Sequence, residues 1–158
     1  MHPKPDLNIN NKIYKQKNQY NFLRYRQAFY GIHITTASAW SKTKRLFIIP
    51  DSVTFIGNFA FSCCGQVADI KMSDNVTSMG IEAIFGTAVY NDMNNWDNDM
   101  FYLGKYLIEA GSVAGDINVR PGTVLVARGA FNYDTALTNV AFGDGNVSID
   151  SWAFDGCT

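Results

Sequence analysis

One pattern of apolar, small and polar positions recurs four times in the second two-thirds of the chain. Each repeat ends on an Ala followed by an apolar residue, and the repeats occupy Ile49–Phe61, Met72–Ile84, Val119–Phe131 and Phe142–Phe154. The Ala residues therefore lie at positions 60, 83, 130 and 153, separated by steps of 23, 47 and 23 residues. An internal period of this kind predicts a repeat architecture in which each unit stacks on the next.

A short alternating segment leads into the repeats. The segments Val67–Met72 and Leu137–Phe142 both have apolar residues at their first, fourth and sixth positions. Alternation of this kind predicts a strand with one buried face, and strands that recur about every 23 residues stack as parallel neighbours. Pro50–Ser52 and Pro121–Gly122 supply the turns that end the strands. The expected fold is a mainly β repeat solenoid with irregular and short helical turns.

The repeated motif resembles a known family. The segment Ile49–Cys64 has the form I-P-D-S-V-T-x-I-G-x-x-A-F-x-x-C, and Ala153–Thr158 closes the last repeat in the same style. This motif is similar to that of the BspA-like leucine-rich repeat family, and the resemblance covers about residues 47–158. It implies a right-handed coil with parallel strands on one face. It also implies a role in surface adhesion or in binding host proteins.

The step of 47 residues indicates an interruption of the array. Gly86–Asn91, Asn95–Trp96 and Tyr102–Ile108 resemble the longer insert unit of the same family. Two aromatic-rich runs flank Gly104–Lys105, which predicts a hairpin with a two-residue turn. We therefore expect about four coils with an insert at about residues 86–116.

The polar run Asn91–Asp99 precedes this hairpin and is expected to be a loop. Its carboxylates are oxygen ligands of the kind that calcium takes. The EF-hand order of acids, glycine and a closing Glu is absent, so a solvated acidic loop is the simpler interpretation. Calcium binding stays open as the alternative.

The end of each repeat supplies the expected core. The aromatic rings fill the wide part of the solenoid, and the Cys three residues later packs between coils. The structural core residues are accordingly Phe61, Cys64, Phe131, Phe154 and Cys157. Phe85 is expected to take the aromatic position in the second coil, one residue late, and Cys63 is expected to be exposed.

Charge is divided unevenly along the chain. Residues 1–46 contain nine Lys and Arg and one acidic residue, whereas residues 47–158 contain four basic and thirteen acidic residues. This difference predicts a boundary near residue 46. Residues 1–46 would form a basic leader that is disordered or outside the family, and residues 47–158 would form the solenoid.

The leader suggests a rival function. Lys12–Lys17 and Phe22–Arg26 interleave cations with aromatic rings, as in segments that bind nucleic acid or an anionic membrane. An unordered extension rich in Asn, Gln and Lys explains the same composition. The alternative to a surface protein is thus an intracellular scaffold fragment whose basic arm binds nucleic acid or a membrane. We rank both of these partners behind a protein or a glycan.

The sequence has no pattern typical of an enzyme. The only histidines, His2 and His33, lie outside the repeats, so a Cys or Ser nucleophile there would lack a base. No Gly-rich phosphate loop is present, and the three cysteines have no metal-binding spacing. We therefore predict a non-catalytic chain with no cofactor and no metal.

Binding is expected on the outward face of the strands. The residues between the apolar positions form two columns, one of Ile48, Lys71, Asn118 and Ala141, and one of Leu46, Asp69, Asp116 and Asn139. The polar members of these columns are the candidate patch for a protein or glycan ligand: Asp69, Lys71, Asp116, Asn118 and Asn139.

The last coil would expose Trp152 and Phe154 at one end, which predicts self-association through this uncapped coil. The resemblance implies a cell-surface or secreted location. The chain shows neither a signal peptide nor a run of roughly 18 apolar residues that could span a membrane, so a cytoplasmic fragment is the alternative.

Overall fold

The computed structural model describes residues 23–28, 31–37 and 45–158, with side chains for residues 46–158. These residues form a mainly β solenoid of about five turns, counting the insert. The described strands are β1 (Leu23–Ala28), β2 (Gly31–Ala37), β3 (Arg45–Ile48), β4 (Val53–Ile56), β5 (Val67–Lys71), β6 (Ser78–Met79), β7 (Trp96–Asp97), β8 (Met100–Leu103), β9 (Tyr106–Ala110), β10 (Gly115–Asn118), β11 (Leu125–Val126), β12 (Leu137–Ala141) and β13 (Ser148–Ile149). One short 3₁₀ helix, η1 (Met93–Asn95), accompanies them.

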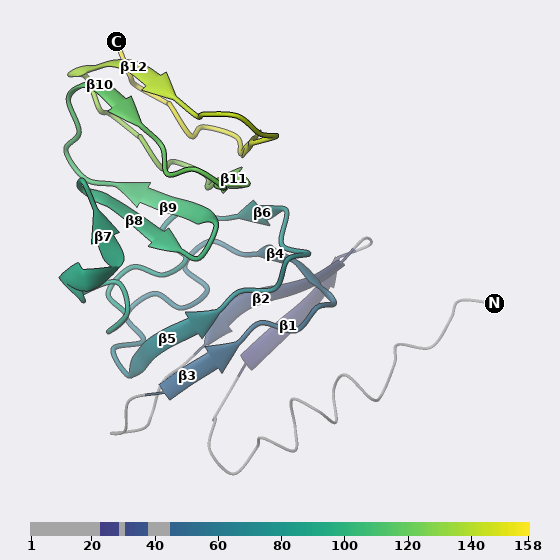
Figure 1. Cartoon of the computed structure of the whole chain (residues 1–158). Coiled ribbons are helices and arrows are strands. Elements are labelled where there is room, and N and C mark those ends of the chain that lie inside the picture. Colours follow the sequence, from purple (N-terminus) through teal and green to yellow (C-terminus); the bar gives the residue numbers. More distant parts are fainter. Residues whose placement is uncertain (1–22, 29–30, 38–44) are drawn as a thin grey trace.

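The alternating segments form parallel strand pairs, as the repeat predicts. β3 pairs with β5, and β10 pairs with β12, each in a two-stranded parallel sheet. Both pairs contain one register shift, between Arg45 and Leu46 and between Gly115 and Asp116. The apolar residues at the first and fourth positions of β5, Val67 and Ile70, are buried. In Figure 1 the two pairs lie at opposite ends of the solenoid.

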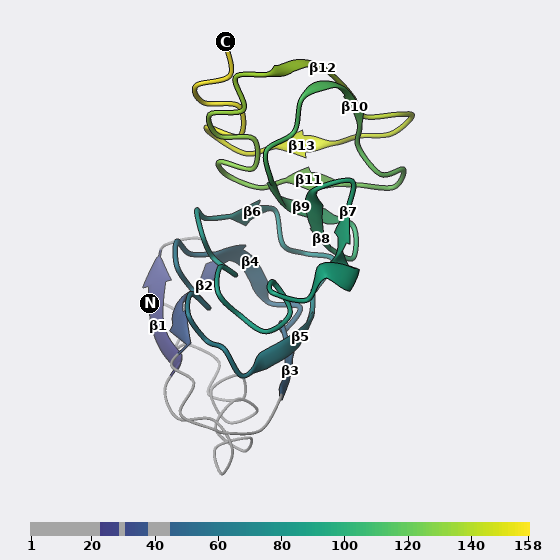
Figure 2. The ribbon, with the colours of Figure 1, turned by 90° about the vertical axis from the view of Figure 1, so that its left-hand side faces the viewer.

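A second series of strands runs along another side of the coils, and apart from β9 of the predicted hairpin the sequence patterns did not indicate it. β2, β4 and β6 pair in parallel, and so do β9, β11 and β13. Figure 2 shows β13, β11 and β9 stacked one above another, with β6 beside β9 and β4 below them. Three of these six strands, β6, β11 and β13, are only two residues long, too short for alternation to be visible in the sequence.

The coils turn through left-handed backbone positions that recur with the repeat. The residue before the recurring Ala of each repeat has a positive φ: 56° at Phe59, 51° at Glu82, 72° at Gly129 and 64° at Trp152. A second such position follows four residues later, at Cys63, Gly86, Tyr133 and Gly156. Backbone bonds join adjacent coils across these turns, for example from Phe61 N to Ala83 O at 2.7 Å and from Phe131 N to Ala153 O at 2.7 Å.

The insert contains the predicted hairpin. β8 and β9 pair antiparallel with Leu103 opposite Tyr106, and Gly104–Lys105 is the two-residue turn between them. The polar run 91–99 is not the plain loop that the sequence suggested. It includes η1 and β7, which pairs antiparallel with β8 across Asn98 and Asp99, two residues with positive φ. Positive φ at both central residues is typical of type I′ hairpin turns, and Asn and Asp adopt it readily.

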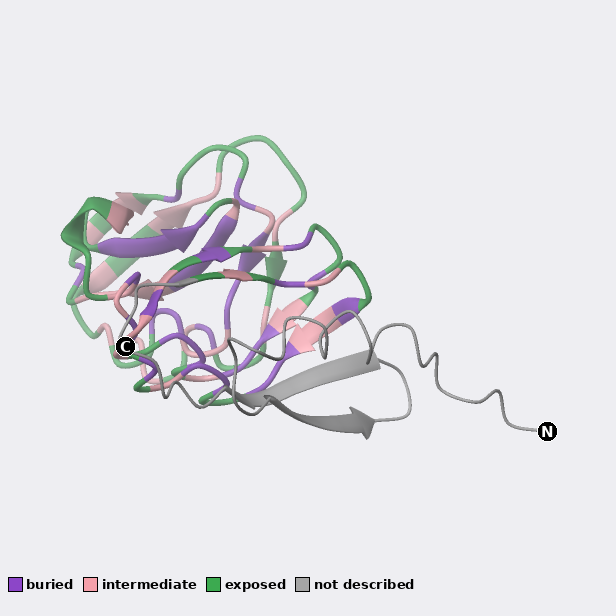
Figure 3. Ribbon diagram, turned by 90° about the horizontal axis from the view of Figure 1, so that it is seen from below, coloured by how far each residue is buried: buried purple, intermediate pink, exposed green. Residues whose placement is uncertain are grey.

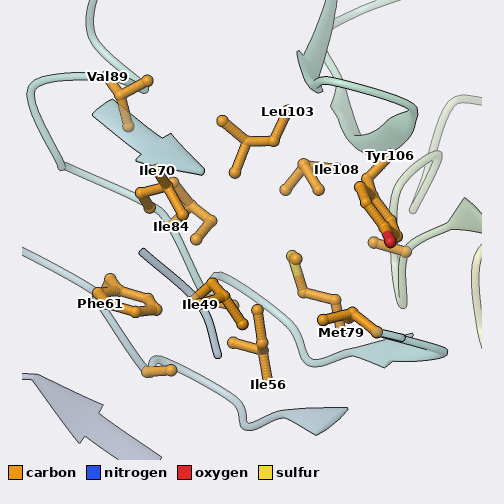
Figure 4. Close-up of a cluster of buried hydrophobic side chains, with 14 of the residues drawn as sticks. Ile49, Ile56, Phe61, Ile70, Met79, Ile84, Val89, Leu103, Tyr106 and Ile108 are labelled. Atoms are coloured by element: carbon orange, nitrogen blue, oxygen red, sulfur yellow. The ribbon is translucent and has the colours of Figure 1, made fainter. Parts of the chain in front are cut away.

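The hairpin separates two hydrophobic clusters. Phe101, Leu103, Tyr106 and Ile108 belong to the cluster of the first coils, together with Phe61, Ile56 and Met79 (Figure 4). The alternate hairpin residues Met100, Tyr102 and Leu107 belong to the cluster of the last coils, around Phe131. Both faces of the hairpin are therefore buried. Figure 3 shows buried strands in the interior and exposed loops at the edges.

The core contains most of the residues that the repeat placed there. Phe61, Cys64 and Phe131 are buried, and Phe131 stacks on Phe154 with ring centroids 4.8 Å apart. Phe154 and Cys157 are half-buried, and the Cys157 thiol lies 3.0 Å from the Phe131 carbonyl, to which it donates. Cys63 is exposed.

The expectation for Phe85 is wrong. Its side chain is 43% exposed, whereas that of Ile84 is 1% exposed. Ile84 directly follows the conserved Ala83, so it occupies the register position that Phe61 and Phe131 fill in their coils. A core position set by register is filled by the residue at that position, even when a larger apolar side chain comes next.

The basic leader lies only partly within the described residues. β1 and β2 fall inside it, and β2 continues the parallel series of β4 and β6. The segment Lys12–Lys17 lies outside the described residues, and so does Phe22. The boundary near residue 46 stays a prediction.

Candidate binding surface

The first part of the strand face combines aliphatic and charged side chains. Leu46 lies opposite Asp69, and Ile48 lies opposite Lys71, in the register that the sequence columns predict. Leu46 and Ile48 are 47% and 53% exposed, and Asp69 and Lys71 are exposed as well. All four point outward because the intervening residues, such as Ile70, face the core.

The second part of the strand face is polar. Asp116 lies opposite Asn139, and Asn118 lies opposite Ala141, again in the predicted columns. The Thr138 hydroxyl donates to Asp116 Oδ1 at 2.7 Å and holds that carboxylate across the strand pair. Asp116, Asn118 and Asn139 are all exposed. They form a surface of hydrogen-bond donors and acceptors.

The structure does not join the five candidate residues into one patch. Asp69 and Lys71 belong to the β3–β5 sheet, whereas Asp116, Asn118 and Asn139 belong to the β10–β12 sheet. The strands β7, β8 and β9 lie between the two sheets (Figure 1). The columns predicted from the sequence took no account of the insert between the two strand pairs. They therefore predicted one continuous surface, whereas the structure has two separate surfaces.

Two of the three acidic residues in the run 91–99 are engaged in structural contacts. Asp92 accepts from the Asn94 backbone at 3.1 Å at the start of η1, and Asp97 forms an ion pair with Arg120 at 3.2 Å. The Arg120 guanidinium also lies 4.2 Å from the centre of the Tyr102 ring. Within the described part of the chain, no three His, Cys, Asp or Glu side chains are placed to hold a metal ion. The calcium alternative for residues 91–99 gains no support from this geometry.

The last coil has an exposed apolar side. Trp152 is 60% exposed and Ile149 is 51% exposed, whereas Phe154 is half-buried. The Arg128 guanidinium lies 4.1 Å from the centre of the Trp152 ring, which holds the indole against the preceding coil. Trp152 and Ile149 are the apolar side chains of this coil that a partner could contact.

The family model for the BspA type leucine rich repeat region matches the chain at residues 17–91 and 35–158, in six copies. The chain belongs to the BspA-type leucine-rich repeat family. In this leucine-rich repeat protein the matched region begins inside the segment that charge alone set apart, where β1 and β2 lie. No curated protein and no solved structure matches the chain.

Membership of this family has consequences for function. Leucine-rich repeat arrays are protein-interaction modules, and their solenoids are generally non-catalytic. In the described part of this leucine-rich repeat protein, no helix is both long and apolar enough to cross a membrane.

Proposed function

We propose that this leucine-rich repeat protein is a non-catalytic adhesion module that binds protein or glycan ligands through its strand face. The observation that carries the proposal is the mixed surface of β3 and β5, where exposed aliphatic chains lie directly opposite a carboxylate and an ammonium group. Aliphatic area supplies binding energy, and adjacent charges supply orientation and specificity. The polar β10–β12 surface is a second contact region of the same face. The proposed location is the cell surface or the outside of the cell.

The test is binding of the full chain to a panel of immobilised extracellular-matrix proteins and glycans. For each ligand found, replacing Ile48→Asp or Asp69→Lys should weaken binding about tenfold or more, since both residues lie within the proposed contact. Asp155→Lys makes the same charge change as Asp69→Lys in the last coil, and should leave the affinity unchanged. The proposal fails if no member of the panel binds, or if the β3–β5 variants bind as tightly as the control.

Self-association through the last coil is part of the same proposal. The exposed apolar side chains of Trp152 and Ile149 are the contact that we propose for a second copy. Light scattering should show a mass above that of the monomer, and Trp152→Arg together with Ile149→Lys should restore the monomer. A monomer of the unchanged chain at about 100 µM would rule this contact out.

The unequal charge distribution supports one alternative, a scaffold fragment whose basic arm binds nucleic acid or an anionic membrane. The full chain would then bind single-stranded DNA or phosphatidylserine vesicles in a salt-dependent manner. Replacing Lys4, Lys12, Lys15 and Lys17 by Gln should abolish that binding. Equal binding by the substituted chain would exclude the arm.

A further inference from the structure

Aromatic rings and carboxylates gather where the insert meets the second coil. Glu82 and Phe85 come from the second coil, Tyr90 and Trp96 from the start of the insert, and Glu109 from β9. These five residues are referred to below as the aromatic–acidic patch. No sequence motif indicated it, because its members come from three different segments.

The floor of the patch is built on the insert sheet. Trp96 lies opposite Phe101, and Phe101 lies opposite Glu109, so these three side chains form one row across β7, β8 and β9. Phe101 is fully buried beneath its neighbours. Tyr90 covers the row, with its ring centre 5.3 Å from those of Trp96 and Phe101.

Hydrogen bonds fix the orientation of the rings. The Tyr90 hydroxyl donates to Glu109 Oε1 at 2.8 Å, and the Trp96 indole donates to the Tyr90 carbonyl at 2.8 Å. The side chains of Tyr90 and Trp96 are therefore held in place before any ligand arrives, which lowers the entropic cost of binding.

Phe85 forms the exposed edge of the patch. Its ring centre is 5.4 Å from that of Tyr90, and 43% of its side chain is exposed because Ile84 occupies the core position. A phenyl face that is held beside the Tyr90 ring and left open to solvent offers a stacking surface.

The electrostatic environment of these rings is negative. Burial, followed by the negative charge of Glu82, raises the pKa of the Glu109 carboxyl, and the Tyr90 hydrogen bond only partly offsets this. The pKa of the Tyr90 hydroxyl is raised as well, mainly by burial and by Glu109, with a smaller contribution from Glu82. The ion pairs among the described residues are Lys105 with Asp74 and Arg120 with Asp97, so none of the described cations neutralises Glu82 or Glu109.

We propose that the aromatic–acidic patch binds an arginine side chain of a partner protein, with the guanidinium against Phe85 and paired with Glu82 and Glu109. The charge of the patch selects a cation, and its aromatic face selects a planar one. A guanidinium stacks on aromatic rings and forms two hydrogen bonds to carboxylates, whereas an ammonium acts as a point charge. The residues of this site are different from those proposed for the strand face, and the site gives the partner a definite chemistry.

The probe is a fluorescein-labelled peptide with three arginines separated by Gly-Ser, compared with the same peptide containing citrulline. Citrulline keeps the shape of arginine but carries no charge. Fluorescence anisotropy with the full chain at low salt should show binding of the arginine peptide and a much weaker response to the citrulline peptide. Phe85→Ala should lower the affinity about threefold or more. Glu82→Gln combined with Glu109→Gln should lower it about tenfold or more.

The control is Asp144→Asn, which removes an exposed negative charge near the other end of the solenoid and should change the affinity less than about twofold. Glu82 and Phe85 are exposed, so their variants keep the fold, and a thermal melt checks this directly. The proposal is overturned if the citrulline peptide binds equally well, which would indicate a neutral stacking site such as one for sugars. Equal weakening by Asp144→Asn would also overturn it, since binding would then depend only on the acidity of the whole chain. Neither outcome depends on whether the strand face binds a ligand, so this proposal and the proposed function can fail independently.

Discussion

Two positions in each coil adopt a left-handed backbone, and glycine fills only some of them. Phe59, Tyr133 and Trp152 have φ values of 56°, 62° and 64°, which are costly for bulky side chains. The next coil holds the turns at Phe59 and Tyr133 in place through backbone bonds from Phe59 N to Ile81 O at 3.0 Å and from Tyr133 N to Asp155 O at 2.8 Å. At Phe59 and Tyr133 the neighbouring coil therefore stabilises the left-handed conformation.

Gly129 allows the cost of a left-handed backbone to be measured. Its φ is 72°, and an added Cβ would make only ordinary contacts, the nearest at 3.7 Å. Gly129→Ala should lower the free energy of unfolding by about 1 kcal/mol, through backbone strain alone. Gly65→Ala is the matched control, since a Cβ there meets nothing within 4 Å and the φ is not in the left-handed region. Chemical denaturation measures both variants, and equal stabilities would contradict the strain.

Glu109 gives the stability of the protein a pH dependence. Its carboxyl is half-buried and its pKa is raised, so the folded state holds this proton at pH values where the unfolded chain has released it. Stability from this group is therefore greatest below the ordinary Glu pKa of 4.5, and falls as pH rises through the raised value.

Glu109→Gln removes the charge, and the amide oxygen still accepts from Tyr90. The variant should be more stable than the unchanged chain at pH 8, and the difference should shrink as pH falls towards 4. Thermal melts across this range measure the effect. A difference that is constant with pH would show that Glu109 ionisation is not its cause.

At the scale of the elements, the β8–β9 hairpin is unusual because it separates two hydrophobic clusters. A surface hairpin buries one face, whereas here alternate residues face different clusters, and Tyr106 is 1% exposed although it carries a hydroxyl. That hydroxyl donates to the Ser73 carbonyl of the second coil at 2.6 Å. Burial raises the pKa of Tyr106, so the hydroxyl stays protonated as a donor.

Tyr106→Phe should destabilise the protein by about 1–2 kcal/mol, because it leaves the Ser73 carbonyl without this donor in a buried environment. Tyr133→Phe is the matched control. Its side chain is 70% exposed, and its hydroxyl makes no hydrogen bond within the described residues. Denaturation midpoints compare the two, and an equal effect would show that the Tyr106 bond contributes no net stability.

At the scale of the whole molecule, the last coil contacts the second coil across the intervening array. Asp150 Oδ2 accepts from the Ser78 hydroxyl at 2.6 Å and from the Met79 backbone at 3.1 Å, bridging more than 70 residues of sequence. The Arg128 backbone donates to the Met79 carbonyl at 3.1 Å, so both polar groups of this residue are paired with later coils. Asp150 stands where two other coils have Gly57 and Gly80.

Asp150→Ala should lower the free energy of unfolding by about 1–3 kcal/mol, because it removes the partner of the buried Met79 amide. In the Asp150→Ala variant, amide hydrogen exchange at Met79 should become faster. Exchange at Gly80 should change less, because the Gly80 amide donates to the Ile56 carbonyl. Asp144→Ala, a change of an exposed acid, serves as the control. Unchanged protection of Met79 would mean that the contact is not maintained in solution.

Several features of the fold and the site followed from the sequence. The period of 23 residues, the outward columns of the strand pairs and the Gly104–Lys105 hairpin all agree with the structure. Each depends on residues close together in sequence, or on a repeat that places equivalent residues in equivalent environments. The second series of strands and the η1–β7 segment were missed, since strands of two residues carry no period.

The sequence by itself determined the family, the coiled architecture and which residues face outward, because alternation and period are properties of a single coil repeated. Only the tertiary structure decided how the coils meet across the insert. It divided the expected binding surface into two parts, left Phe85 exposed beside Tyr90, and brought Asp150 to Met79. These outcomes depend on contacts between segments of the chain that are not equivalent repeats. Such contacts produce no repeating pattern in the sequence.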